Sequence, residues 1–263
     1  MKMKYVLYFL FLLVCLDIDA SLAPLNIPQE TIQKISERVW KNECGGRIEG
    51  LTHWNENENF PSFGIAHYIW YIKGKEARFE ETFPTLLLFL QSEGVVLPNW
   101  LKNANGCPWQ SREQFYQKFQ SQEMVTLRDL LVKTKDLQGL FIAKRLEKTL
   151  DQIVAALPDR DKQRVSSLLQ KLAQDPQGLY ALIDYLNCKG SGLSPKETYR
   201  GQGWGLTQVL LQIPASSTNP LVDFVESAKK VLTERVKNSP PENQEERWLK
   251  GWHNRIHTYL EAK

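Results

Sequence analysis

Apolar residues recur at three- and four-residue spacing along most of the chain, which is the pattern of helices with one buried face. In the segment 28–43 this spacing is carried by Ile32, Ile35 and Val39. A proline stands at the start of the segment, where a helix tolerates it. The glycines at 45–46 follow its end, as capping glycines do. The segment therefore predicts a helix that ends just before these glycines.

Further segments share the helical spacing: 85–91, 112–120, 140–157, 162–174, 178–187, 221–236 and 245–262. One stretch differs, because "SFGIAHYIWYI" (residues 62–72) is rich in β-branched and aromatic residues and is bounded by a proline and "KGK". It predicts a strand. The whole pattern predicts a mainly α (α+β) protein, with a hairpin-sized strand region inserted into a helical body. The polar break "NSPPENQEE" (238–246) is too short to mark a domain boundary.

The N-terminus combines the basic start "MKMK", an unbroken apolar run at 5–16 and small residues after it. This is the layout of a secretory signal. The run is shorter than the about 20 residues that span a bilayer. We therefore expect a signal peptide at 1–20 and a single exported domain at 21–263, periplasmic or secreted, without a stable membrane anchor.

Charge and length exclude some classes of function. The 263 residues include 33 Lys and Arg against 30 Asp and Glu, a net charge of +3. No basic block interleaves with aromatic residues, so a nucleic-acid partner is not expected. The slight positive excess suits approach to an anionic polymer such as a cell wall. The length is sufficient for a domain with a hydrophobic core. We expect the protein to be monomeric.

Three cysteines follow the expected signal peptide: Cys44, Cys107 and Cys188. An odd number is not a disulfide framework, although one bridge between Cys107 and Cys188 stays open in an oxidising compartment. No CxxC pair is present. His253 and His257 have the spacing of two metal ligands on a helix, but no glutamate follows His253 as in a zinc-protease motif. We therefore expect neither a metal nor a cofactor.

Glu43 is the first candidate for chemistry. It lies four residues after Val39 and three after Trp40, so it continues the apolar stripe of the first helix. It also lies at the helix C-terminus, where the dipole disfavours an anion. Burial and dipole both raise the pKa of a carboxyl group, as a general acid requires. The alternative is a solvated acid in the last helical turn.

Two further acids, Glu56 and Glu58, follow in a loop rich in asparagine. A carboxylate in such a loop is solvated and should stay ionised. One carboxyl group in an apolar setting and another in a polar one is the arrangement that glycoside hydrolysis uses. The alternative is that both are ordinary loop acids.

The stretch "PSFGIAHYI" resembles the "T-x-G-x-G-H" strand of the phage-type (T4-like) lysozymes. In that family a catalytic Glu ends the first helix, and a carboxylate and then a Thr follow in a β-hairpin with five residues between them. Here Glu43, Glu56 and Ser62 follow in that order, with five residues between Glu56 and Ser62. Gly64 and His67 stand where the family has Gly and His.

The resemblance implies a lysozyme-like fold, with a helical lobe and a small β-hairpin lobe on the two sides of a cleft. It implies that Glu43 protonates the leaving oxygen, that Glu56 stabilises positive charge or activates water, and that Ser62 positions that water. His67 would orient the hairpin. The interval after Glu43 is longer than in the family, so Glu58 is an alternative second carboxylate.

Other segments extend the resemblance. Trp252 and Arg255 lie in a segment similar to the C-terminal "GL…RR" of the family, whereas its second strand glycine is Ala66 here. Tyr68 and Trp70 could stack on sugar rings, although strand aromatics are more often core.

The stretch "GQGWGLTQVLLQIP" (201–214) is similar to the "G-L-M-Q-x-M-P" segment of lytic transglycosylases and goose-type lysozymes, where it lies closer to the catalytic Glu. The expected function is an exported glycoside hydrolase (muramidase) that cleaves peptidoglycan glycan strands. A lytic transglycosylase with a single catalytic Glu, or a non-catalytic wall-binding protein or inhibitor, is the alternative.

A cysteine peptidase built on Cys44 and His67 is disfavoured. Nucleophilic cysteines favour helix N-termini, where the dipole lowers the thiol pKa. Cys44 lies at the C-terminus of the predicted helix.

Export gives the first prediction. If residues 1–20 are removed, the N-terminal sequence of the exported protein should begin near Ser21. Sequencing of the protein recovered outside the cytoplasm measures this. Intact Met1 on a protein that stays in the cytoplasm would refute it.

Overall fold

The computed structural model describes residues 24–25, 27–75 and 79–261, and the expected signal peptide lies outside this part of the chain. Most of the described residues are helical, and the strands are short. The prediction of a mainly α protein with a small β region is therefore confirmed.

Helix α1 (Gln29–Cys44) forms as its sequence predicts. Pro28 caps its N-terminus, and the face that includes Ile35 and Val39 is buried. Gly45 ends the helix in the left-handed conformation at φ 63°, and its N–H bonds to the carbonyl of Trp40. Glycine adopts this conformation without steric cost.

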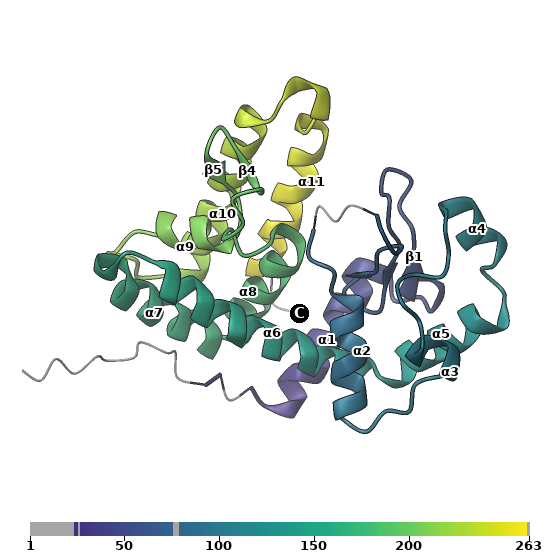
Figure 1. The fold of residues 1–263 in the computed structure, drawn as a ribbon. Coiled ribbons are helices and arrows are strands. Elements are labelled where there is room, and N and C mark those ends of the chain that lie inside the picture. Colours follow the sequence, from purple (N-terminus) through teal and green to yellow (C-terminus); the bar gives the residue numbers. More distant parts are fainter. Residues whose placement is uncertain (1–23, 26, 76–78, 262–263) are drawn as a thin grey trace, which may run out of the picture.

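Two groups of elements lie on either side of a central pair of helices (Figure 1). The pair consists of α1 and α6 (Lys135–Ala156), which pack against each other. Helix α6 also contacts α2 on one side of the molecule and both α7 and α8 on the other. It therefore connects the two lobes.

The first lobe contains the β-sheet and four helices. Its elements are η1 (Glu49–Leu51), β1 (Thr52–His53), β2 (Ser62–Phe63), β3 (Tyr68–Ile69), α2 (Phe83–Ser92), α3 (Asn99–Lys102), α4 (Arg112–Gln117) and α5 (Gln122–Lys133). The sheet is antiparallel in the order β1-β2-β3. Its core is a cluster of aromatic rings, with Phe63 packed on Phe83, Trp109 and Phe115.

The prediction of one strand over residues 62–72 is wrong, because the segment folds into two strands. Phe63 pairs with Tyr68 in antiparallel register. Between them Gly64 and His67 have φ values of 76° and 52°, and the His67 N–H donates to the Gly64 carbonyl at 3.2 Å. Positive φ angles break an extended chain, so the apolar run reverses direction instead of continuing.

The second lobe is helical. Its elements are α7 (Asp159–Gln174), α8 (Pro176–Lys189), β4 (Thr198–Tyr199), β5 (Gln202–Gly203), α9 (Leu206–Gln212), α10 (Pro220–Asn238), η2 (Pro241–Asn243), α11 (Glu246–His257) and η3 (Thr258–Leu260). The segment 238–246 connects α10 to α11, as predicted. The β4–β5 hairpin and helix α5 of the first lobe were not predicted.

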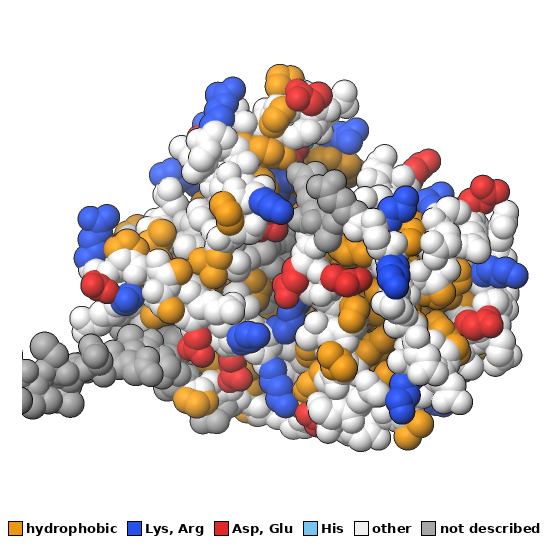
Figure 2. All heavy atoms as spheres, viewed as in Figure 1, with side chains coloured by type: hydrophobic (Ala, Val, Ile, Leu, Met, Phe, Trp, Pro, Cys, Tyr) orange, Lys and Arg blue, Asp and Glu red, His pale blue; other side chains and the backbone are white. Residues whose placement is uncertain are grey.

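Within residues 24–25, 27–75 and 79–261, no helix has the length and apolar character that a membrane crossing requires. On the face drawn in Figure 2, basic and acidic side chains are interspersed rather than gathered into one patch.

The packing of α8 against α7 gives a prediction about stability. A Cβ atom on Gly178 would lie 2.3 Å from the carbonyl oxygen of Leu172, so the backbone of the α7–α8 connection would have to move. Gly178→Ala should lower the free energy of unfolding by about 1–3 kcal/mol, as measured by urea denaturation.

Gly251→Ala is the matched control, because a Cβ atom there meets no atom within 4 Å in helix α11. It should leave stability unchanged or raise it by up to about 1 kcal/mol, the helix propensity gained. Equal stability changes for the two variants would contradict the close approach at Gly178.

Candidate functional site

A cleft of about 790 Å³ lies between the two lobes. The side of α1 and the sheet contributes polar residues: Glu43, His53, Asn55, Glu58, Ser62 and His67. The helical lobe contributes a mixed wall: Asn187, Lys189, Ser191, Trp204, Arg235 and Trp252. Glu80, Arg145 and Glu197 line the cleft as well, so charged side chains of both signs face it.

Glu43 lies in this cleft at the end of α1, and its side chain is 16% exposed. The apolar environment that the helical stripe predicted is not found. The Nη2 atom of Arg255 donates to Oε1 of Glu43, and Nδ1 of His67 lies 3.8 Å from Oε2. Glu43 therefore enters the cleft with a guanidinium and an imidazole beside its carboxyl group.

Arg255 also binds Asp184, the most buried acid of the site. Its Nε and Nη2 atoms donate to the two Asp184 oxygens at 2.8 and 2.7 Å. Burial raises the pKa of Asp184, but the hydrogen bonds and charge of Arg255 outweigh it and hold that pKa below its ordinary value. Burial alone would lower the pKa of Arg255, and the hydrogen bonds to Asp184 raise it instead.

Two tyrosines complete the surroundings of Asp184. The hydroxyl of Tyr259 donates to Asp184 at 2.6 Å, and that of Tyr180 donates at 3.0 Å. Asn42, next to Glu43 on α1, donates to the Tyr180 hydroxyl at 2.6 Å. The network therefore links the end of α1 to α8, α11 and η3. Neither Asp184 nor the tyrosines were singled out by the sequence.

The loop between β1 and β2 gives Glu56 and Glu58, the two candidates for the second carboxylate, different surroundings. The Glu58 N–H donates to the Asn55 carbonyl at 3.2 Å, which closes a turn with Glu56 near its tip. Glu56 is exposed and is not among the residues that line the cleft. Glu58 does line it, and burial raises the pKa of its carboxyl group. Trp54 fixes this end of the loop, because its Nε1 donates to the Glu58 carbonyl at 2.8 Å.

Ser62 and His67 both line the cleft. The Nε2 atom of His67 lies 3.1 Å from the carbonyl oxygen of Gly50, so the ring links the β2–β3 turn to η1. His53 stacks on His67 with 5.6 Å between ring centroids. Burial and then the neighbouring His67 lower the pKa of His53.

The structure also brings Cys44 and His67 together, with Sγ 3.7 Å from Nε2. Cys44 is buried and is not among the residues that line the cleft. Burial, with a contribution from Glu43, raises the pKa of its thiol to about 12. A neutral thiol without access to substrate is no nucleophile, so this geometry does not support a cysteine peptidase.

Tyr68 and Trp70 do not reach the cleft, so the structure contradicts their expected stacking on sugar rings. Tyr68 is 1% exposed and Trp70 is 2% exposed. The Tyr68 hydroxyl donates to the Gln138 carbonyl at 3.3 Å, and Trp70 packs on Phe63 and Phe83. Both are core residues, the alternative that strand aromatics generally favour.

The segment 201–214 forms part of the cleft wall. Trp204 lines the cleft, and the N–H of Leu206 donates to the Gly190 carbonyl at 3.0 Å. The approach to the loop after α8 is so close that a Cβ atom on Gly205 would lie 2.1 Å from the Gly192 nitrogen. The glycines of "GWG" therefore place Trp204 beside the end of α8.

The remaining candidates lie outside this arrangement. Cys107 and Cys188 are free thiols, so the bridge left open between them is not formed. The Nε2 atom of His253 lies 3.2 Å from the Lys229 carbonyl, a contact within the helical lobe. Among the described residues no group of three His, Cys, Asp or Glu side chains could hold a metal ion.

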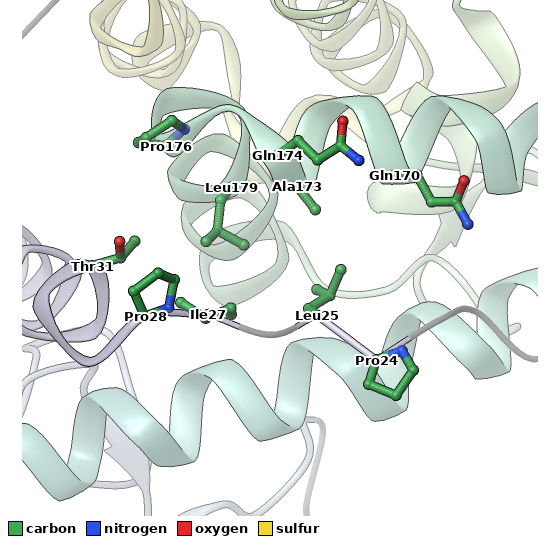
Figure 3. A pocket seen from close by; sticks show the side chains of 10 residues that line it. All are labelled: Pro24, Leu25, Ile27, Pro28, Thr31, Gln170, Ala173, Gln174, Pro176 and Leu179. Carbon is green, nitrogen blue, oxygen red and sulfur yellow. The ribbon is translucent and has the colours of Figure 1, made fainter.

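A second hollow, of about 540 Å³, lies between the segment before α1 and the α7–α8 connection. Figure 3 shows Leu25 and Ile27 from that segment facing Ala173 and Leu179. None of the described residues that line it has an ionisable side chain. It therefore offers no group for acid–base chemistry, in contrast to the cleft.

No protein-family model, curated protein or solved structure matches this chain.

The Asp184–Arg255 pair gives a prediction about pH. Asp184→Asn should destabilise the protein by about 3–5 kcal/mol at pH 7, since it breaks a buried ion pair. The native pKa of Asp184 lies below its ordinary value. Its contribution is therefore complete above about pH 4, the ordinary Asp pKa, and is lost as the pH falls through the native pKa.

Urea denaturation at pH 7 and near pH 3 measures this, and the two proteins should differ less at the acid pH. Asp159→Asn is the control, because Asp159 pairs with Lys162 on the surface, and it should resemble the wild type. An unchanged difference between wild type and Asp184→Asn at both pH values would contradict the assignment.

Proposed function

We propose that this protein is an exported peptidoglycan-cleaving glycoside hydrolase that acts on the bond between amino sugars. The observation that carries the proposal is the presence of two partly buried carboxyl groups, Glu43 and Glu58, in one cleft between two lobes. Glycoside hydrolysis requires such a pair on either side of the scissile bond. The resemblance of the hairpin to phage-type lysozymes supports the same substrate.

In the proposed mechanism Glu43 donates a proton to the leaving oxygen, as the resemblance implies. Glu58 takes the place first expected for Glu56, because it is the hairpin acid that lines the cleft. It stabilises the positive charge that develops on the sugar or activates water. Ser62 lines the same cleft and is available to position that water.

The surroundings of the two acids also support the opposite assignment, in which Glu58 donates the proton and Glu43 does not. Arg255 holds Glu43 in an ion pair, whereas burial raises the pKa of Glu58 and favours its protonated form. Glu58 is therefore the alternative proton donor. Substrates whose leaving groups differ in basicity distinguish the two assignments. A weakly basic leaving group departs without a general acid, so its rate does not depend on the proton donor.

A lytic transglycosylase is the second candidate. It is favoured by the position of Trp204, whose segment resembles that of the transglycosylases and which lines the same cleft as Glu43. Such an enzyme closes a hydroxyl of the sugar onto the anomeric carbon and works with a single glutamate. Its products carry an anhydro end, whereas the products of hydrolysis have gained one water.

Loss of either carboxyl group should reduce the release of sugar products from purified peptidoglycan. Glu43→Gln should slow the reaction by at least about 100-fold, in the range of a lost general acid. Glu58→Gln should slow it at least about tenfold, or about 1.4 kcal/mol of transition-state stabilisation. Glu56→Gln is the matched control and should retain wild-type activity, because Glu56 does not line the cleft.

Aryl glycosides and product masses complete the experiment. The variant that lacks the general acid should regain activity on an aryl glycoside, whose leaving group needs no proton. If Glu58→Gln regains activity and Glu43→Gln does not, Glu58 is the proton donor. Anhydro products together with a fully active Glu58→Gln variant would favour the transglycosylase. Binding of peptidoglycan by the wild type without product release would favour a non-catalytic wall-binding protein.

A further inference from the structure

The helical wall of the cleft carries two cations packed on two tryptophans. Lys189 ends α8, and its Nζ lies 3.7 Å from the ring centroid of Trp252. The guanidinium of Arg235 lies 4.1 Å from the ring of Trp204 and 4.9 Å from that of Trp252. All four residues line the cleft, and we call them the cationic wall.

The charges of the cationic wall are unequally compensated. Arg235 donates from Nε and Nη2 to the two oxygens of Glu245, at 2.8 and 2.7 Å. The Nε and Nη2 atoms of the Arg235 guanidinium are therefore already occupied by Glu245. Lys189 takes part in none of the ion pairs found among residues 24–25, 27–75 and 79–261. Lys189 therefore brings to the cleft an ammonium that none of these ion pairs uses, although Glu197 lines the same side of the cleft.

We propose that the cationic wall binds a carboxylate of the substrate through Lys189. The inference rests on the proposed function and extends it, because it names the substrate as glycan that carries peptide carboxylates, in preference to neutral glycan. Trp252 would pack beside the bound substituent while Lys189 pairs with its charge.

The chemistry of the wall favours a carboxylate over a phosphate. Phosphate is recognised best by guanidinium forks, which bind two oxygens at once. The fork of Arg235 is closed by Glu245, and the free cation is a single compact ammonium. A single ammonium outside the ion pairs of the described residues matches a singly charged group. The hydroxyl-bearing Ser191 lines the cleft close along the chain and can donate to the same group.

The ionisation of Lys189 gives carboxylate binding at this site a pH dependence. Burial lowers its pKa to about 8, and Arg235 and Arg255 lower it as well, whereas Cys188 and Glu245 raise it. These groups face Lys189 from α8, α10, α11 and the α10–α11 connection. Its positive charge, and with it the attraction for a carboxylate, is therefore lost as the pH rises above about 8.

The test uses the full mature chain and a ligand without a glycosidic bond, so that no turnover occurs. The ligand is a muramic-acid monosaccharide that carries a two-residue peptide, compared with the same compound after amidation of its carboxylates. Calorimetry or ligand-detected NMR measures the affinity. The wild type should bind the carboxylate form about tenfold more tightly than the amide, as for a charge-assisted contact.

Lys189→Met keeps most of the side-chain volume and removes the charge. It should lose the preference for the carboxylate form and should bind the amide as the wild type does. The wild-type preference should fall between pH 7 and pH 9, while the variant shows no such change. Lys250→Met is the matched control, because Lys250 is an exposed lysine of α11 that does not line the cleft, and it should resemble the wild type.

Equal affinity of the wild type for the two ligands, or no detectable binding of the carboxylate form, would overturn the inference. So would an unchanged preference in Lys189→Met. These outcomes are distinct from a failure of the proposed function. A protein that prefers the carboxylate ligand but releases no sugars from peptidoglycan has a carboxylate site without glycosidase activity, whereas a glycosidase without the preference retains the function and lacks the site.

Discussion

The guanidinium of Arg255 between Glu43 and Asp184 is the interaction on which the candidate site depends. It joins α1, α8 and α11, which come from both ends of the described chain. Asp184 is buried, and an unpaired charge at that depth would cost several kcal/mol of desolvation, which Arg255 offsets. Tyr180 and Tyr259 use the remaining capacity of Asp184 for hydrogen bonds. The lobe that carries the hairpin and the helical lobe are thus fixed to each other at the place where Glu43 enters the cleft.

This arrangement divides the charge of the cleft. Arg255 contacts the carboxyl groups of both Glu43 and Asp184, so acids outnumber cations at this contact. In the cationic wall Arg235 pairs with Glu245, whereas Lys189 takes part in no ion pair of the described residues. Under the proposed function, the sugar at the scissile bond would lie beside Glu43, and an anionic substituent of the glycan would lie beside Lys189.

The parts of the fold that could be predicted from the sequence are those set by local rules. Helix α1 follows from apolar spacing and a glycine cap, and these rules also place Glu43 at its end. The hairpin was predicted as one strand because strand-forming residues continue through Gly64 and His67, and their positive φ angles are not visible in a hydrophobic pattern. Glu56 was preferred to Glu58 on spacing alone, whereas a turn of the loop decides which of them faces the cleft. The partners of Arg255 lie 71 and 212 positions away, so no local pattern could have named them.

The two cations of the helical wall show how a binding role differs from a structural one. Arg235 packs on Trp204 and is closed by a bidentate pair with Glu245, so the fold itself uses its hydrogen bonds. Lys189 also packs on an aromatic ring, but burial opposes its charge, and no carboxylate of the described chain pairs with it. A desolvated ammonium of this kind is unfavourable in the free protein unless an anion joins it. The free energy regained when a carboxylate enters is largest where the cation is already in place and unpaired, which is the condition that Lys189 meets at the edge of the cleft.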